Sequence, residues 1–459
     1  EGEGSAKPQV LRVGGRRYGA ARRRSRERDQ QNRRFCVSAG GGTVPHADDR
    51  GRGISKTAGF ACRRAEVRCR TPTIEREGVR MKRATNASVM RASNRKLILN
   101  QIRLGPVSRV ELSERTCLTR ASVTQIVDEL IGTGLIEPVR AVDRGERGRR
   151  RIQLAIRPDA RYAFGVSIKR KRCDVGVVDL SGNVKAEQTL SIKGREPEEV
   201  LREVAGIIAA QKKSLALDDR RILGVGVSAP GPIDYLDGRI LNPPNFSAWH
   251  NLPVCERIRA LTGMESMLEK DTNASALEER FFGAAREVSS FMLLLMEEGV
   301  GSGVMIQDRL YRGMNGLGSE LGHTSIRHDG RPCNCGHIGC LETYVSTQAL
   351  LEGTDYPSWE ALARDEKNPA AHEIIDRAAE YLACALVNAV NLYDIEQVIL
   401  TGDVEKYPAP LLNRLNPLLH ERAIIRVRVR LKDVIMGCTA APVRAGAMAV
   451  LYDLFQDRA

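Results

Sequence analysis

The sequence of 459 residues lacks the long apolar stretches of a membrane protein. Phe291–Met296 is typical of its apolar runs, and it is far shorter than the about 20 residues that a membrane-spanning helix needs. No signal peptide opens the chain, which begins at Glu1 and not with Met. The eleven cysteines are an odd number and are scattered apart from one cluster, which argues against a disulfide scaffold. We therefore expect a soluble cytoplasmic protein with free or metal-binding thiols and no membrane partner.

An excess of positive charge is concentrated at one end of the chain. The formal net charge is +14, but residues 1–80 hold 20 Lys or Arg against 9 Asp or Glu, a net of +11. This segment has no sustained apolar period, and its composition is typical of disorder. It is either a basic arm that adds non-specific phosphate contacts or upstream sequence included by the choice of start site. We favour the second interpretation, with Met81 as the natural start.

Helical periodicity begins at Asn94. The apolar residues that should share one face of a first helix are Leu97, Ile98 and Ile102. Gly105 and the proline after it should end that helix, and Ser108 opens a capping box for a second one. Thr119 can cap a third helix, whose apolar residues between 123 and 131 recur at 3/4 spacing. Two short helices, a tight turn and an amphipathic third helix predict a helix-turn-helix.

Polar residues at the start of the third helix should face away from its apolar stripe, where a recognition helix reaches base edges. The charged hairpin of residues 139–154 follows and is typical of the wing of a winged helix, whose arginines suit phosphates or a narrow minor groove. For the wing alone, a solvated charge run is the alternative. The candidate DNA contacts are Thr119, Arg120, Ser122, Thr124, Gln125, Arg147, Arg149 and Arg150. We expect a double-stranded DNA operator as partner, bound by a homodimer or homotetramer.

A cluster of one histidine and three cysteines predicts a metal site. The pattern is H-x9-C-x-C-x4-C, formed by His323, Cys333, Cys335 and Cys340. One imidazole and three thiolates are a ligand set for tetrahedral, structural zinc; the alternative is a loop with unrelated thiols. Gly336 and Gly339 let the loop turn tightly. Glu320 and Glu342 flank the ligands, so folding around the metal should bring both carboxylates near one point.

The same stretch resembles a known family. Glu320-x-Gly322-His323, followed by C-x-C-G-x-x-G-C-x-E, is similar to the signature of the ROK family of sugar kinases and bacterial transcriptional repressors. The segment from Met81 also resembles the N-terminus of a ROK repressor. The resemblance implies that Asp271, Glu320, His323 and Glu342 contact sugar hydroxyls, with the aspartate as the catalytic base in kinases.

The remainder of the chain alternates strands and helices. Strands are expected at 162–167, 173–180, 184–192, 222–227, 291–296 and 397–401, and helices at 197–211 and 372–393. The first three strands, the helix after them and the next strand begin an α/β unit of the ribonuclease-H-like kind. The pattern alone predicts only an α/β fold with two lobes, and the resemblance implies the actin-like sugar-kinase fold. We thus predict a disordered tail (1–80), a winged helix-turn-helix (81–157) and a ROK domain with the zinc motif (158–459).

Three further residues are expected at or beside the sugar site. Asn245 has an amide that suits sugar hydroxyls, and Trp249 nearby could supply a flat apolar surface. Lys270 precedes Asp271 where ROK sugar sites usually have Asn, and lysine is a donor only. It either pairs with Asp271, faces the ligand or turns to solvent. We hypothesise that the effector carries a carboxylate or phosphate, or that neutral hexoses bind poorly.

One kinase feature is missing. ROK kinases carry an Asp-x-Gly-Gly-Thr turn for phosphate after their first strand, whereas this chain has Ser167-Ile168-Lys169-Arg170-Lys171. The glycine-rich turn expected at residues 299–303 survives. We therefore predict a transcriptional regulator, a repressor of carbohydrate uptake or catabolism genes, that is controlled by a sugar effector and has no catalytic residues. The alternatives are a sugar kinase with a fused DNA-binding domain and a regulator controlled by a protein partner.

Overall fold

The computed structural model describes residues 87–139, 152–424, 431–437 and 441–456. The predicted tail, Met81 and the wing tip with Arg147, Arg149 and Arg150 lie outside these ranges. Within them, no helix is long and apolar enough to cross a membrane.

The first described elements form a helical unit with a small sheet. The helices are α1 (Ala87–Arg103), α2 (Arg109–Thr116) and α3 (Arg120–Gly132). The strands are β1 (Val107–Ser108), β2 (Ile136–Val139) and β3 (Gln153–Ile156), paired antiparallel in the order β1-β3-β2. A strand pair that directly follows the third helix is the hairpin of a winged helix-turn-helix, as the sequence predicted.

Local signals fix the ends of these helices. Ser108 and Glu111 form a reciprocal capping box at α2, and the Oγ1 of Thr119 accepts the Ser122 amide at α3. The prediction for α1 was wrong in one residue. Ile98 is fully buried, but the side chain of Leu97 is 40% exposed, because α1 turns its neighbour Leu99 inward instead.

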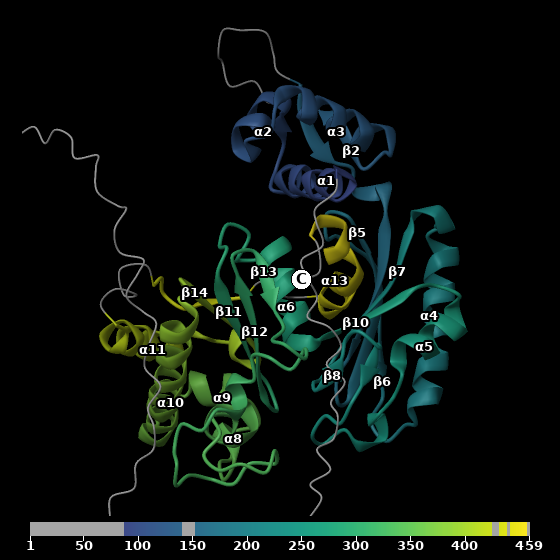
Figure 1. The fold of residues 1–459 in the computed structure, drawn as a ribbon. Helices are drawn as coiled ribbons and strands as arrows, with labels where there is room; N and C mark the ends of the chain where they lie inside the picture. The colour runs from purple at the N-terminus through teal and green to yellow at the C-terminus, as the bar shows by residue number, and fades with distance from the viewer. Residues whose placement is uncertain (1–86, 140–151, 425–430, 438–440, 457–459) are drawn as a thin grey trace, which may run out of the picture. The chain divides into compact units, whose positions relative to one another are not determined.

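The rest of the chain forms two lobes, each with a five-stranded sheet (Figure 1). In lobe 1 the strand order is β10-β7-β4-β5-β6. Its strands are β4 (Tyr162–Ile168), β5 (Arg172–Asp179), β6 (Val184–Ser191), β7 (Ile222–Ala229) and β10 (Ser266–Lys270). The helices α4 (Pro197–Ser214) and α5 (Val254–Thr262) cover its outer face, and a two-stranded ribbon pairs β8 (Ile233–Asp234) with β9 (Arg239–Ile240).

Lobe 2 repeats this plan with the order β13-β12-β11-β14-β15. Its strands are β11 (Phe291–Met296), β12 (Val300–Ile306), β13 (Arg309–Tyr311), β14 (Gln397–Gly402) and β15 (Ile435–Met436). The helices on its outer side are α7 (Glu342–Val345), α8 (Thr347–Leu351), α9 (Trp359–Arg364), α10 (Pro369–Tyr393) and α11 (Ala409–Arg422). Two such α/β lobes are the actin-like sugar-kinase architecture that was expected.

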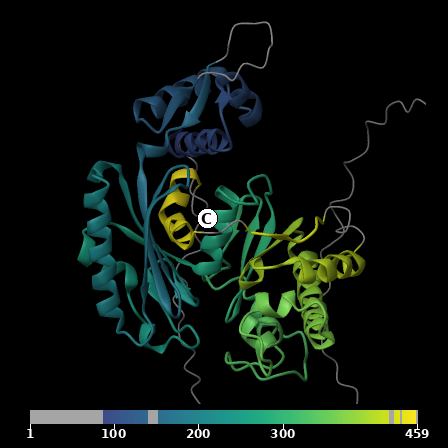
Figure 2. The same cartoon turned by 180° about the vertical axis from the view of Figure 1, so that it is seen from behind.

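Two helices lie between the sheets. The helix α6 (Asp271–Phe281) packs on β12, α13 (Pro442–Phe455) packs on β4 and β7, and the two helices pack on each other (Figure 2). Glycines permit this close approach: a Cβ on Gly165 would lie 1.8 Å from the carbonyl oxygen of Val443 in α13. The first residue of α6 is Asp271, so this helix also carries a predicted sugar ligand to the space between the lobes.

The glycine-rich turn was predicted too long. Only Gly299 lies in the turn between β11 and β12, whereas Gly301 and Gly303 are strand residues of β12. A Cβ on Gly301 would lie 2.6 Å from Cγ2 of Thr272, and one on Gly303 would lie 2.4 Å from the Thr272 carbonyl oxygen. These two glycines therefore make room for α6, and their spacing needs no phosphate to explain it.

Candidate functional site

A cavity of about 790 Å³ lies between the lobes. All six predicted sugar-binding residues line it: Asn245, Lys270, Asp271, Glu320, His323 and Glu342. They come from a loop of lobe 1, the junction of β10 with α6, and the stretch that holds the predicted metal ligands. Folding thus brings together residues that are up to 97 positions apart in the sequence.

Asp271 occupies the N-terminal end of α6 and lines the cavity. Its Oδ1 accepts the amide of Thr272 at 2.7 Å. Burial raises the pKa of Asp271 to about 6, whereas the neighbouring charge of Lys270 opposes that rise. The carboxylate is therefore mostly ionised at neutral pH and can accept hydrogen bonds from hydroxyl groups.

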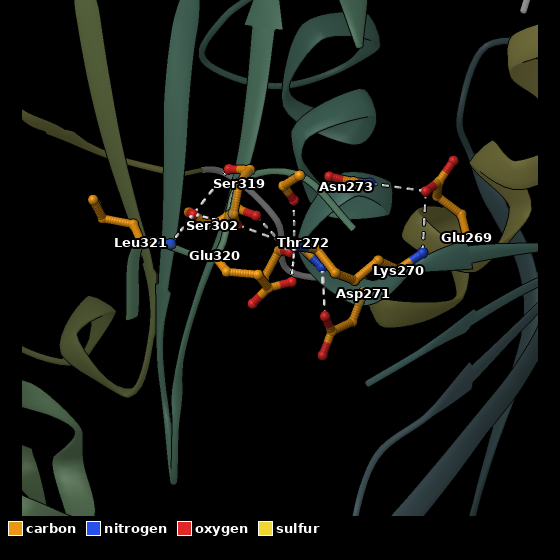
Figure 3. A network of polar contacts seen from close by, with 10 residues as sticks. Glu269, Lys270, Asp271, Thr272, Asn273, Ser302, Ser319, Glu320 and Leu321 are labelled. Atoms are coloured by element: carbon orange, nitrogen blue, oxygen red, sulfur yellow. Dashed lines mark hydrogen bonds and ion pairs between the residues drawn. The ribbon is translucent and has the colours of Figure 1, made fainter. Parts of the chain in front are cut away.

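Lys270 points away from solvent and toward lobe 2 (Figure 3). Its ammonium donates to Oε1 of Glu320 at 3.0 Å and to the carbonyl oxygens of Ser319 and Gly318 at 3.2 and 3.4 Å. An ammonium has three N–H donors, so these acceptors account for all of them. Lys270 pairs with Glu320 and not with Asp271, and no N–H remains for a ligand. An acidic effector was expected on the premise that Lys270 faces the ligand. The structure does not support that expectation, since the ammonium bonds to protein acceptors instead.

A buried ion pair behind the cavity was missed by the sequence analysis. Both the Nε and the Nη2 of Arg312 donate to Oε2 of Glu269, at 2.9 and 2.7 Å, and both side chains are almost fully buried. The other carboxylate oxygen of Glu269 accepts the Lys270 amide and the side-chain amide of Asn273. This pair ties β10 to the loop that leads to Glu320. The pair could not be predicted from the local sequence, because nothing around Glu269 indicates that its partner lies 43 residues away.

The four predicted metal ligands converge on one point. The ligand atoms of His323, Cys333, Cys335 and Cys340 all lie within 4.8 Å of one another. The sulfur atoms of Cys335 and Cys340 are 3.6 Å apart, and Sγ of Cys333 is 3.7 Å from Nδ1 of His323. Tetrahedral zinc with Zn–S bonds of ~2.3 Å has ligand–ligand edges of about 3.8 Å, so the donor set fits. Gly336 and Gly339 both have positive φ, as the tight loop required.

The metal loop is connected to the turn between β11 and β12. Glu342 follows Cys340, the last of the predicted cysteine ligands, and accepts the amide of Val300 at 2.8 Å. Five residues later, Thr347 donates both its amide and its hydroxyl to the carbonyl oxygen of Glu297. A metal at this site would thus hold the loop that presents Glu342 to the cavity, which is a structural role.

The turn after β4 closes the opposite side of the cavity. Lys169 pairs with Glu297 at 2.5 Å, and Lys171 pairs with Glu298, so that lobe 1 and lobe 2 are linked by two ion pairs. Arg170 between them donates to the carbonyl oxygen of Pro244. The lysines of the turn after β4 thus neutralise two glutamates in the turn between β11 and β12.

Of the two candidates in lobe 1, Asn245 reaches the cavity and Trp249 does not. Asn245 is exposed, has a φ of 58° and lines the cavity. Trp249 does not reach the cavity, because it stacks on Phe246 in the lobe 1 core and is only 2% exposed. The expected flat surface beneath a sugar ring is therefore not supplied by Trp249.

The recognition helix presents its predicted polar face to solvent. Arg120, Thr124 and Gln125 are exposed, whereas Thr119 and Ser122 bond to each other as part of the helix cap. The first turn of α3 holds no acidic residue. Further along the helix, Asp128 pairs with Arg109. The described part of α3 thus exposes uncompensated positive charge only at its N-terminal end.

Comparisons with known proteins agree with this geometry. Residues 163–440 match the sequence profile of the ROK family. The xylose repressor of Caldicellulosiruptor bescii is 28% identical over 386 residues, which cover 77% of this chain and 96% of that protein.

Solved structures add the fold. A ROK family transcriptional regulator, described as a homologue of the E. coli MLC protein, matches with a TM-score of 0.68 at 25% identity, and covers 80% of this chain and 97% of its own. The ROK hexokinase from Thermus thermophilus matches with a TM-score of 0.54 at 26% identity, and covers 64% and 99%. The regulator therefore covers a larger part of this chain than the kinase does. Because the family profile spans more than half of the sequence, the chain belongs to the ROK family.

Proposed function

We propose that this protein is a transcriptional repressor that binds operator DNA through residues 81–157 and senses a sugar in the ROK domain of residues 158–459. The observation that supports this function is that one chain combines a helix with an exposed polar N-terminal face and a cavity lined by the six predicted sugar-binding residues. The exposed face of α3 supports DNA binding, and the six lining residues support sugar sensing. Its similarity to a xylose repressor makes a pentose the first sugar to test.

The polar side chains of the cavity support a neutral sugar as the ligand. The lining includes six carboxylates, those of Asp271, Glu297, Glu298, Glu320, Glu342 and Glu352. Three cationic side chains line the same cavity, those of Arg170, Lys270 and Arg331, and Lys270 is already bonded to Glu320. Carboxylates therefore outnumber cations by six to three, which suits hydroxyl groups as hydrogen-bond donors and disfavours a phosphate or a carboxylate.

Catalysis of phosphoryl transfer is not part of this proposal. A kinase must stabilise the charge of the transferred phosphoryl group with backbone amides, cations and Mg²⁺. Here the turn after β4 has no glycine, and its lysines pair with Glu297 and Glu298. Asp271, which matches the position of the kinase base, would then serve only as a hydrogen-bond acceptor for the sugar.

Zinc is the metal that we propose for the His323 cluster, because three thiolates and one imidazole form a closed, soft ligand set. Its chemistry there is structural. We also propose a cytoplasmic location beside the chromosome and a homodimer or homotetramer, since a helix-turn-helix protein commonly reads two half-sites.

Operator binding and its release by sugar test this function. The full-length protein should bind the DNA beside its own gene, and D-xylose or another neutral pentose or hexose should weaken that binding. Gln125→Ala should weaken binding to this DNA by about 1–3 kcal/mol and binding to unrelated DNA far less. The control is Gln188→Ala, an exposed glutamine on β6. ADP release with the same sugars would favour the kinase alternative, and operator binding that ignores every sugar would favour control by a protein partner.

A further inference from the structure

Arg103, the last residue of α1, is buried although it is charged. The residue is only 8% exposed. Its Nε donates to Oδ1 of Asn100 at 2.9 Å, so its own helix holds the guanidinium in place. No acceptor among the described residues bonds to its Nη2. Burying a guanidinium with an unused donor lowers the stability of the fold, so stability alone does not explain why an arginine stands here.

Those remaining contacts are with the last residue of α6. The Nη1 of Arg103 donates to the carbonyl oxygen of Phe281 at 2.5 Å, and the guanidinium carbon lies 4.3 Å from the centre of the Phe281 ring. A cation at the C-terminal end of a helix is favoured by the helix dipole, and a guanidinium over an aromatic ring adds a cation–π attraction. Arg103 therefore joins the helix-turn-helix to the end of α6, beside the packing of α1 on α13.

The opposite end of α6 is the sugar site. Asp271 begins the helix and lines the cavity, and Thr272 donates its hydroxyl to the carbonyl oxygen of Ser302 in β12. Every residue from 272 to 281 except Ser275 is buried. A helix of 11 residues is about 16 Å long. A helix so closely packed moves as a unit, because a shift at one end cannot be absorbed along its length.

We propose that Arg103 is the positioning residue that couples the sugar site to the DNA-binding unit, by holding α1 on the C-terminal end of α6. A sugar bound at Asp271 shifts α6 along its axis or about it, and Arg103 transmits that shift to α1. This inference rests on the proposed function and adds the path by which the sugar acts. The electrostatics of the site are consistent with a contact of small net stability: burial, followed by the charges of Arg280 and Arg286, lowers the pKa of Arg103 to about 9.

The test compares Arg103→Met with Lys96→Met. Lys96 is also on α1, but it donates to the carbonyl oxygen of Gln456, beyond the end of α13, and not to α6. Three quantities are measured on the full-length protein: the Kd for D-xylose or the neutral sugar that releases the wild type, the Kd for operator DNA, and the ratio of DNA affinities without and with saturating sugar. Hydrogen exchange of the α1 and α6 amides is followed in parallel.

In Arg103→Met, we expect the sugar Kd to stay within about twofold and the sugar-induced loss of DNA affinity to shrink at least about tenfold. Sugar should still change hydrogen exchange in α6 but no longer in α1. Lys96→Met should keep the wild-type ratio. If Arg103→Met released DNA on sugar binding as fully as the wild type does, the proposal would be wrong.

A second variant covers the case in which Arg103→Met does not fold. Phe281→Leu keeps the carbonyl group and removes the ring, so it should reduce the coupling ratio by a smaller factor. An unchanged ratio in that variant would overturn the proposal. A wild-type protein whose DNA binding ignores every sugar would contradict the proposed function instead, so the two failures are distinguishable.

Discussion

The two sides of the cavity differ in how closely their residues match the ROK kinases. On the side of α6 and the metal loop, three of the four residues that the family resemblance assigns to sugar contacts have a defined partner: Thr272 for Asp271, Lys270 for Glu320 and Val300 for Glu342. On the opposite side, the β4–β5 turn consists of basic residues and contains no glycine. Lysines and glutamates pair there across the gap between the lobes.

This difference shows which parts of a kinase fold a sensor needs. Recognition of a sugar depends on directed hydrogen bonds, so the side chains that make them must keep their positions. Phosphoryl transfer depends on backbone amides that approach phosphate closely, and bulky residues in that turn abolish this approach. A repressor can lose the second set and still bind its effector.

The largest effect is expected from breaking the metal site on the sugar side. Cys335→Ser should reduce the zinc content from about one ion per chain to near zero, because a three-coordinate site binds far more weakly. Glu342 would lose its fixed loop, and we expect no measurable sugar binding. Elemental analysis and calorimetry would measure both. The matched control is Cys384→Ser, an exposed thiol away from the cluster; a fully folded, metal-free wild type would contradict the zinc assignment.

The next largest effect is the pH dependence of sugar affinity, which also depends on the side of α6. Asp271 has a pKa raised to about 6 by burial, so its ionised fraction, and with it the affinity for a neutral sugar, should fall as the pH drops through 6. Between pH 7 and pH 5 the loss should be about tenfold. Asp271→Asn keeps an oxygen for the Thr272 amide, and should bind sugar about 10–100-fold more weakly with a flat pH profile. Calorimetry at several pH values would reveal this, with Asp237→Asn, an exposed turn acid, as control.

A smaller effect is expected at Lys270, which supports the sugar side without facing the ligand. Lys270→Met removes the ammonium that fixes Glu320, and should weaken the binding of a neutral sugar about 3–10-fold. This is less than the loss of a direct charge-assisted hydrogen bond to the ligand would cause, because Lys270 acts only by positioning Glu320. The wild type should reject uronic acids and sugar phosphates. Tight binding of an acidic sugar by the wild type, lost in Lys270→Met, would restore the acidic-effector hypothesis.

The smallest effect is expected on the side of the β4–β5 turn. Glu297→Gln removes the partner of Lys169, and because both side chains are partly exposed, it should change sugar affinity by only about two- to threefold. The change should disappear at high salt, where surface ion pairs are screened. A loss as large as that of Asp271→Asn would mean that the two sides of the cavity do not differ as described.

Sequence reasoning recovered the parts of the structure that carry local signals. Strand β11 was predicted with both ends correct, and the caps at Ser108 and Thr119 form as expected. The H-x9-C-x-C-x4-C spacing named four side chains that converge in the structure, and the family resemblance, together with Asn245 and Lys270, named six that line one cavity. For the strand and the caps, the information lies within a few consecutive residues.

The features that were missed depend on partners distant in the sequence. Helix α6 was not predicted because its buried surface includes Glu278, Glu279 and Arg280, which no apolar period would reveal. Glu278 is tolerated there because it pairs with Arg444 of α13, 166 residues later, although burial still raises its pKa to about 8. The prediction that Leu97 is buried was wrong because both Leu97 and Leu99 are apolar, and the sequence does not show which of them α1 turns inward.

The ion pairs that Lys169 and Lys171 make across the gap have a consequence for how the protein reports on its surroundings. A receptor that transfers no phosphoryl group returns its ligand chemically unchanged. Under the proposed function, occupancy would depend on the concentration of free sugar and the dissociation constant alone, with no contribution from the ATP level of the cell. Such a response is reversible and consumes no ATP, so a cell starved of ATP would respond to the same sugar concentration as a well-fed one.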